Sequence, residues 1–331
     1  MTNESCFRLA SRYRAVERRT PEEVVRVVAF VQVLFEGIVT GSLYGLLALG
    51  IVLIYRTTGV LNFAYGTLGA LCACFMYILM TGPRIGFWLA LLLTLLFALV
   101  FGAVVERLFA RPVMHTPVFT KAIATLALAL VLQTLAMQLW PQLTQPEHFS
   151  TPFEGMALRI GGVYITAVDL LILGVTALVM VSLNLFLTRT RLGIAMRATA
   201  DNLAVARLMG VPVSVMFLLV WALSALVAGL AGILLASQSQ IIDVQFMDPI
   251  LILAFVGAVL GGLDSLPGAL IGGIVIGVAD NLLALFLAGH TLGALNISDP
   301  GIRETLIFGG FVLALLFRPQ GLFGRAVLRR V

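Results

Sequence analysis

Residues 86–105 read GFWLALLLTLLFALVFGAVV, twenty consecutive positions without a charged side chain. As an α-helix this stretch is about 30 Å long, which matches the hydrocarbon core of a lipid bilayer. Comparable runs recur along the 331-residue chain, which is 60% hydrophobic and 11% charged and has a mean hydropathy of +1.07. Soluble domains are about a quarter charged, and disordered chains contain fewer apolar residues. Both classes are therefore excluded.

The apolar runs are long and unbroken rather than alternating, which excludes an outer-membrane β-barrel. They predict an all-α fold, a polytopic transmembrane helical bundle with about eight or nine spans, some of them broken or re-entrant. The expected helices lie at 30–55, 60–80, 86–105, 122–140, 166–188, 213–236, 249–262, 267–288 and 303–318. Only 249–262 and 303–318 are too short to cross the bilayer, so broken helices are expected there first.

The distribution of basic residues and apolar runs divides the chain into three parts. A basic polar arm covers 1–27, a transmembrane domain covers 28–319, and a basic tail covers 320–331. Most basic residues lie just beyond apolar runs, which is typical of orientation signals and not of a nucleic-acid-binding surface. We therefore expect membrane lipid, and no nucleic acid, around this chain.

The loops between the runs differ in charge. Loops 106–121 and 189–212 are rich in arginine, as is the tail, so all three are predicted to be cytoplasmic. Loops 141–165 and 237–248 carry mainly acidic residues and are predicted to face out. Counting helices back from these loops puts the N-terminus outside, whereas the arginine-rich arm indicates the inside. Either an early segment is re-entrant or the arm is an atypical extension.

Two further patterns concern packing. The 141–165 stretch contains three prolines and an alternating piece at 158–165, which predicts a small hairpin or plug at the outer mouth, or else an ordinary solvated connector. Glycines four residues apart leave a groove on one helix face, which permits close backbone approach. These pairs are Gly41/Gly45, Gly257/Gly261, Gly268/Gly272 and Gly273/Gly277.

No motif supports catalysis. A phosphate-binding loop is absent, as is Gly-x-Ser-x-Gly, and no histidine has a carboxylate or cysteine at metal-ligand spacing. We predict no catalytic residues, no metal site and no cofactor bound by this chain. The carboxylate deepest within an apolar run is Asp280, next to Asn281. These two residues form a possible intramembrane polar site, or they simply bond to a neighbouring helix.

Residues 55–66 interrupt a long apolar segment with polar groups. Gly59 and Gly66 flank Asn62 there. A broken helix at this point would expose backbone groups, which membranes tolerate only beside protein or a cavity. The alternative is a simple hairpin between two helices.

The cytoplasmic stretch 191–211 is rich in Ala, Leu, Met and Arg, which favours one helix ending at Gly210 before Pro212. Such a helix between two spans needs a partner, either lipid headgroups or a groove in a soluble protein. Its small residues favour the protein.

Four pieces in this order resemble the LivH-type permeases of branched-chain amino acid ABC importers. They are 41–50 continuing into 61–66, 106–112 followed by 123–126, the 191–211 stretch, and 258–269 with 317–324. The resemblance covers most of 30–325 and implies a helical bundle of the ABC-importer permease type in a bacterial inner membrane. The C-terminus would be cytoplasmic.

The resemblance also implies partners and sites. The partners would be a second related permease, two cytoplasmic ATP-binding cassette subunits that hold ATP and Mg, and an extracytoplasmic substrate-binding protein. The residues that would dock on an ATPase subunit are Arg197, Ala200, Asp201, Asn202, Ala206 and Gly210. The residues that would lie near the translocation path are Gly59, Asn62, Ala64, Tyr65 and Gly66. Family members often carry His where Tyr65 stands, and they usually lack the basic arm.

The expected function is therefore the permease subunit of an ATP-driven importer for branched-chain or related small amino acids, and not an enzyme. A urea or short-chain amide importer is the alternative within the same class, because those permeases look alike. A passive small-solute channel is the alternative from a different class, with 62–64 as a degenerate channel motif. The second copy of that motif, which a channel requires, is missing.

Overall fold

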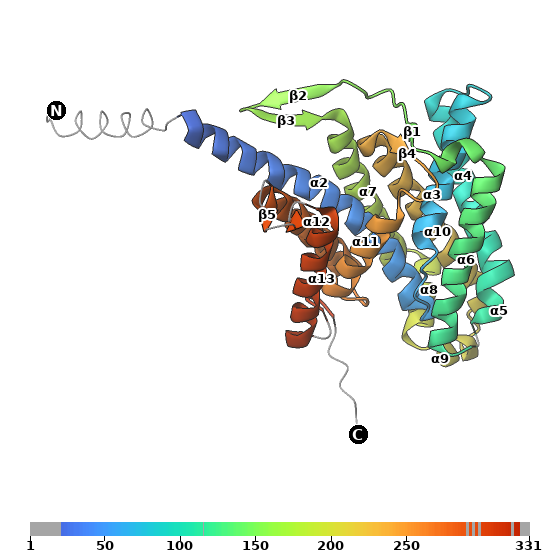
Figure 1. Cartoon of the computed structure of the whole chain (residues 1–331). Coiled ribbons are helices and arrows are strands. Elements are labelled where there is room, and N and C mark those ends of the chain that lie inside the picture. Colours follow the sequence, from blue (N-terminus) through green and yellow to red (C-terminus); the bar gives the residue numbers. More distant parts are fainter. Residues whose placement is uncertain are drawn as a thin grey trace, which may run out of the picture.

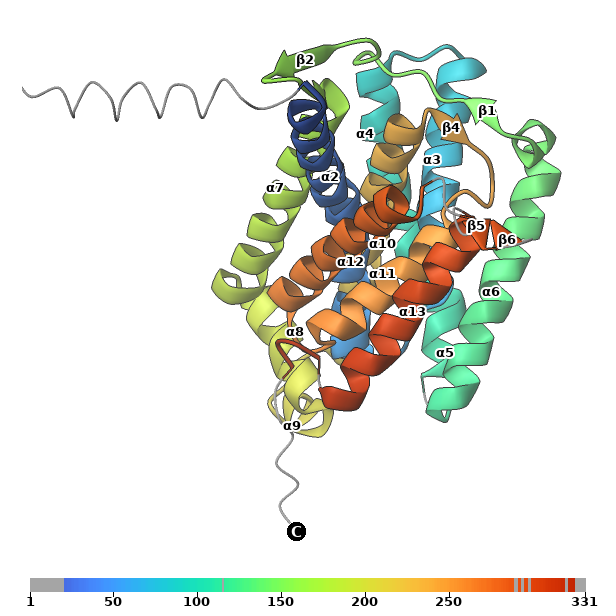
Figure 2. The same cartoon turned by 60° about the vertical axis from the view of Figure 1, so that its left-hand side comes forward.

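A computed structural model describes residues 21–324 except 115, 289–290, 293–294, 297–298 and 319–320. The described chain is a helical bundle (Figures 1 and 2). Its long helices are α2 (Pro21–Thr58), α3 (Tyr65–Thr81), α4 (Phe87–Val105), α6 (Val118–Leu139), α7 (Ala167–Arg189), α10 (Val213–Ser239), α11 (Asp248–Gly261), α12 (Leu266–Leu287) and α13 (Pro300–Phe317). These correspond one to one to the nine predicted helices.

Shorter elements connect the helices. A π-helical turn, η1 (Glu106–Ala110), joins α4 to α5 (Arg111–Val113), and a 3₁₀ turn, η2 (Pro141–Thr144), follows α6. Two further helices, α8 (Arg191–Asp201) and α9 (Leu203–Leu208), separate α7 from α10. The short strands are β1 (Glu147–His148), β2 (Ala157–Ile160), β3 (Val163–Thr166), β4 (Ile241–Ile242), β5 (Thr291–Leu292) and β6 (Leu295–Asn296).

Six helical segments of the described chain have the length and composition of membrane spans. They are Arg26–Thr58, Phe87–Val113, Val118–Leu139, Ala167–Arg189, Val213–Ser239 and Leu266–Leu287. The prediction that 249–262 is short is confirmed by the 14 residues of α11. The prediction of a full span at 60–80 is wrong, because α3 has 17 residues and a length of about 26 Å.

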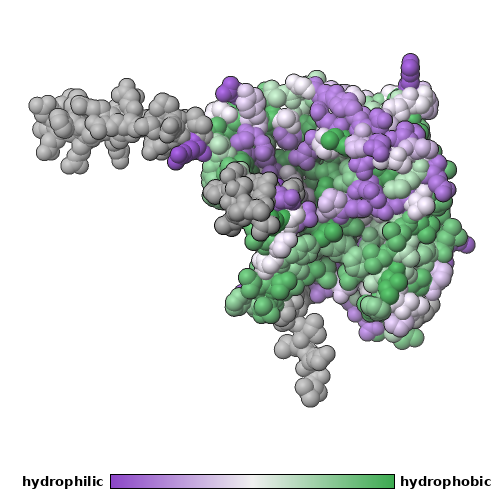
Figure 3. All heavy atoms as spheres, viewed as in Figure 1, coloured by the Kyte–Doolittle hydropathy of each residue, from purple (hydrophilic) through white to green (hydrophobic). Residues whose placement is uncertain are grey.

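The bundle has two distinct ends. The loops that were predicted to share one side of the membrane lie together at the same end. At the "hairpin end", β1 pairs with β4, so 141–165 and 237–248 lie together. At the "α8–α9 end", Arg111 donates to the backbone oxygen of Ser214, which joins loop 106–121 to the start of α10 (3.4 Å). Figure 3 shows hydrophilic residues gathered over the hairpin end and a hydrophobic surface below it.

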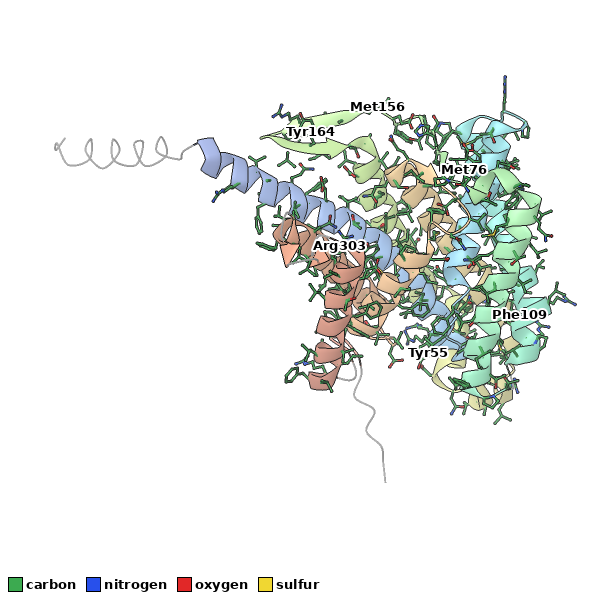
Figure 4. All side chains as sticks on the ribbon, viewed as in Figure 1. Tyr55, Met76, Phe109, Met156, Tyr164 and Arg303 are labelled. Carbon is green, nitrogen blue, oxygen red and sulfur yellow. The ribbon has the colours of Figure 1, made fainter. Side chains whose placement is uncertain are left out.

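The predicted hairpin exists. Strands β2 and β3 pair antiparallel across the turn Gly161–Gly162, and the strands are largely exposed. The hairpin is fixed to α2, because the Gln32 side chain donates to Tyr164 O (3.0 Å) and accepts from Tyr164 N (2.8 Å). Tyr164 lies on β3 above α2 in Figure 4. Helix α2 therefore runs from the hairpin end to the α8–α9 end, in agreement with the helix count, while 1–20 lie outside the described residues.

The glycine pairs form two close helix–helix seams, as predicted. A Cβ on Gly273 or Gly277 of α12 would overlap the backbone of Gly45 or Gly41 in α2. A Cβ on Gly272 would likewise overlap the backbone of α11. The small residues thus let α2, α12 and α11 pack backbone against backbone at the centre of the bundle.

Candidate functional site

The predicted cytoplasmic helix at 191–211 is two helices, which corrects the single helix expected there. Asn202 is extended (φ −156°, ψ 104°), and its Oδ1 accepts from Ala204 N and Val205 N at 3.0 Å each. An Asn that caps the next helix offers the backbone an alternative to continuing the first one. The α8–α9 segment therefore bends at Asn202. It ends at Gly210, which has φ +80° as in a left-handed C-terminal cap.

The six predicted docking residues occupy different environments. Ala206 is buried and contributes to packing within the chain, whereas Asp201 and Gly210 are exposed. Arg197 and Ala200 line a cavity of about 400 Å³ together with Arg56. The buried Nε of Arg197 has no hydrogen-bond partner in the described part of the chain. The structure thus brings Arg197, Ala200 and Asp201 to one cavity and gives Asn202 and Gly210 backbone roles.

The segment is firmly attached to the spans. A Cβ on Gly193 of α8 would overlap the backbone of Phe186 and Leu187 in α7, and Thr190 caps α8 through Gly193 N (3.0 Å). Several apolar side chains of α9 and the turn that follows it nevertheless face solvent, including Val205, Leu208 and Met209. A solvent-facing apolar surface at the end of rigid helices is suited to contact with another protein.

Residues 59–64 separate α2 from α3, as both the broken-helix prediction and the hairpin alternative require. Gly59 has φ +66°, and the Asn62 Oδ1 accepts from Ala64 N at 3.0 Å. Thr125 of α6 accepts from Phe63 N and donates to Leu61 O, both at 3.2 Å. These bonds satisfy backbone groups that a broken helix leaves free.

The polar residues of this break point into protein. Asn62 is 1% exposed, and its Nδ2 has no acceptor among the described residues. Ala64 and Tyr65 are also buried, and Tyr65 donates to Ser224 O (3.0 Å) in α10. Gly66 packs on Leu251 in the first turn of α11. The structure brings these predicted path residues together, and their part in a path stays a prediction.

Asp280 lies in a buried polar cluster joining three helices. Its Oδ1 forms an ion pair with Arg303 Nε of α13 (2.6 Å), and its Oδ2 accepts from Tyr44 of α2 (3.1 Å). Asp280 is 6% exposed, and Arg303 lies against α12 in Figure 4. The neighbouring Asn281 donates to Gly277 O, within its own helix (3.0 Å). The cluster matches the alternative in which Asp280 bonds to neighbouring helices.

Asp248 is a site residue that sequence reasoning missed, because it was counted with the outward-facing loop 237–248. It is the first residue of α11. The preceding Met247 packs between Gly69 of α3 and Gly232 of α10. At 1.5 Å per residue these glycines lie about 10–18 Å below the hairpin ends of their helices. The chain from 240 to 247 therefore re-enters the bundle, and α11 begins inside it.

Asp248 has a polar neighbour, but no described residue neutralises its negative charge. Gln133 of α6 donates to both carboxylate oxygens, at 2.8 and 3.0 Å. No basic side chain forms an ion pair with Asp248 in the described chain. Asp248 is half-buried, and Gln245 just before it is exposed. A short apolar run preceded by Asp-Pro at 248–249 was the available signal, since half-helices in transporters begin at such breaks.

No group of three or more His, Cys, Asp or Glu residues could hold a metal ion in the ranges that the structure describes. The polar groups lie at helix breaks and helix junctions, where transporters place their paths.

Comparison with known proteins agrees with this geometry. Residues 33–317 match the family model described as "Branched-chain amino acid transport system / permease component". The permease protein BraD of a high-affinity branched-chain amino acid transport system in Pseudomonas aeruginosa is 30% identical, over 91% of this chain and 98% of BraD. LivH of Escherichia coli K12, with the same description, is 30% identical over the same shares. A probable LivH of Methanocaldococcus jannaschii is 32% identical, over 88% of this chain and 92% of that protein.

One solved structure, PsaBC from Streptococcus pneumoniae in complex with Fab, aligns with 92% of this chain and 98% of that chain at 16% identity, with a TM-score of 0.46. The family model spans nearly the whole bundle, from α2 to α13. The chain therefore belongs to the family of permease components of branched-chain amino acid transport systems.

Proposed function

We propose that this chain is the permease subunit of an ATP-driven importer for branched-chain or related small amino acids. A second permease subunit completes the translocation path. The observation that carries the proposal is the family match over 33–317, within which α8 and α9 form a two-helix segment at one end of the spans. A partly apolar segment that is attached to the membrane spans can bind a soluble partner and transmit the movements of that partner to the spans.

The α8–α9 end is then cytoplasmic, and so is the C-terminus. ATP and Mg are held by two ATPase subunits, one of which docks on α8–α9. Because Gly193 packs directly on the α7 backbone, a displacement of α8 is passed to the spans as a rigid movement. An extracytoplasmic binding protein delivers substrate at the hairpin end of a multi-pass protein in the bacterial inner membrane.

The path runs beside the starts of α3 and α11. Gly66 packs on Leu251 there, and Asp248 lies one turn earlier on α11. The zwitterion of an amino acid carries an ammonium group, which an uncompensated carboxylate with a Gln133 neighbour attracts. Urea and short amides carry no such charge. The named relatives also concern branched-chain amino acids, so the amide alternative is not favoured.

A docking test uses one exposed valine. Val205→Arg places a charge on the exposed face of α9, which is 51% exposed at this position. We expect loss of co-purification of the co-expressed ATPase subunits and loss of leucine uptake, with an unchanged melting temperature. Leu158→Arg on the exposed β2 strand at the opposite end is the matched control for ATPase co-purification, which it should leave unchanged. Normal co-purification and uptake in the Val205 variant would contradict docking through α8–α9.

A further inference from the structure

A second cavity lies at the α8–α9 end, separate from the cavity beside Arg197. It has a volume of about 300 Å³ and lies between the ends of α5, α6, α9 and α10. Its apolar wall includes Met114, Val213 and Phe217. Its polar wall holds three basic side chains, Arg111, Lys121 and Arg207.

Two of these basic groups are free. Lys121 and Arg207 form no ion pair with any residue that the structure describes. Arg111 is occupied, because it contacts the fully buried Glu106 at 3.2 and 3.3 Å. No carboxylate is among the described residues that line the cavity. The cavity therefore carries an uncompensated positive charge, which favours an anionic ligand.

The backbone adds to this charge. Helix α10 begins at this cavity, because its first two residues, Val213 and Ser214, line it, and its N-cap Pro212 provides no side-chain cap. The first N–H groups of a helix lack partners within the helix and carry a partial positive charge. The start of α10 and two free basic side chains thus face one space.

The position of the cavity identifies the source of the anion. The spans beside it, Phe87–Val113 and Val118–Leu139, bury only 28% and 22% of their most apolar stretch, against 89% for Arg26–Thr58. They are outer helices of the described chain, and α6 lies at the edge of the bundle in Figure 2, so we expect lipid beside them. Lys121 is the fourth residue of α6, and the nearby Phe119 is 77% exposed. Basic side chains at the ends of lipid-facing helices lie at the level of the lipid headgroups.

We propose that this cavity binds the phosphate headgroup of an anionic phospholipid through Lys121 and Arg207. The acyl chains would lie along α4 and α6. Because Arg207 belongs to α9, the bound lipid would also hold one end of the α8–α9 segment against the membrane surface. Free phosphate has the same chemistry at its oxygens, but it gains nothing from the exposed apolar helices beside the cavity.

The test is native mass spectrometry of the purified full chain with phosphatidylglycerol, with phosphatidylcholine, or with inorganic phosphate alone. We expect retained phosphatidylglycerol, and about 25-fold weaker retention in Lys121→Gln/Arg207→Gln, since each basic group near an anionic surface contributes about fivefold. The control Arg189→Gln/Arg191→Gln removes the same charge at the same end, from exposed positions that do not line the cavity. It should keep phosphatidylglycerol retention within about twofold of the unmodified chain.

Three outcomes would overturn the proposal. The first is equal retention of phosphatidylglycerol by the unmodified chain and the Lys121/Arg207 double variant. The second is an equal loss in both double variants, which would indicate diffuse attraction without a site. The third is equal occupancy by inorganic phosphate alone, which would assign the basic groups to another ligand.

Discussion

Asp280 and Asp248 both lie inside the bundle, and their surroundings differ in kind. Asp280 on α12 is buried and neutralised by Arg303 at 2.6 Å, with Tyr44 as a second partner. Asp248 at the start of α11 is half-buried and has only the amide of Gln133, at 2.8 and 3.0 Å. A compensated charge ties helices together, whereas an uncompensated one at an accessible break attracts a cation. We therefore expect Asp280 to serve the structure, and we propose Asp248 as a residue of transport.

The largest expected effect on stability follows from breaking the compensated pair. Asp280→Leu leaves Arg303 without its partner, which should cost about 3–5 kcal/mol and lower the melting temperature and the yield together. The double variant Asp280→Leu/Arg303→Leu removes both charges and should recover most of the loss. Thermal unfolding of both variants measures this, and a stable Asp280→Leu protein without uptake would reverse the assignment of Asp280.

An intermediate effect is expected at Asn62, whose side chain is buried like Asp280 but uncharged. Asn62→Leu removes the acceptor for Ala64 N, and leaving this buried donor without a partner costs about 1–3 kcal/mol. Uptake should fall in proportion to the amount of folded protein. Asn62→Ser keeps a weaker acceptor. Its uptake and melting temperature should therefore lie between those of the unmodified chain and those of Asn62→Leu. Lost uptake at an unchanged melting temperature would instead place Asn62 on the path.

The smallest effect on stability is expected at Asp248. Asp248→Asn keeps the shape of the side chain and removes its charge, so stability should change by less than about 1 kcal/mol, the interaction of one carboxylate with a helix N-terminus. The KM for leucine should rise about tenfold, the equivalent of one hydrogen bond to a charged group. Uptake kinetics in membrane vesicles measure this change. An unchanged KM, or a large drop in melting temperature, would contradict a transport role for Asp248 and indicate a structural role like that of Asp280.

Much of the bundle could be predicted, because apolar run length and arginine bias are local signals that the bilayer itself imposes. Glycine spacing likewise predicted the seams of α2, α12 and α11. Two features required the structure. The bend at Asn202 depends on one side chain capping the following helix, in a stretch whose composition favours an unbroken helix. Tyr44 and Asp280 are 236 positions apart, and no local pattern encodes such a contact.

Asp248 shows that the charges of a loop do not predict how deep the loop lies when the chain re-enters the bundle. A carboxylate next to an apolar run is expected in a solvent-facing loop, and the rule for loops holds at Glu147, which lies at the hairpin end on β1. The same rule misplaces Asp248, because 240–247 re-enters the bundle before α11 begins. The depth of a loop is a property of tertiary packing and is absent from hydropathy.

Cysteine accessibility tests the contrast between the two carboxylate regions most directly. In a chain whose Cys6, Cys72 and Cys74 are replaced by alanine, Asp248→Cys is compared with Ile276→Cys, which lies one turn from Asp280 and is buried. A membrane-impermeant maleimide added at the hairpin end should label the Asp248→Cys variant and leave the Ile276→Cys variant unlabelled. Labelling of the Asp248→Cys variant should be slower when leucine and the partner subunits are present. Equal labelling of both variants, or no labelling at Asp248, would contradict an accessible carboxylate at the start of α11.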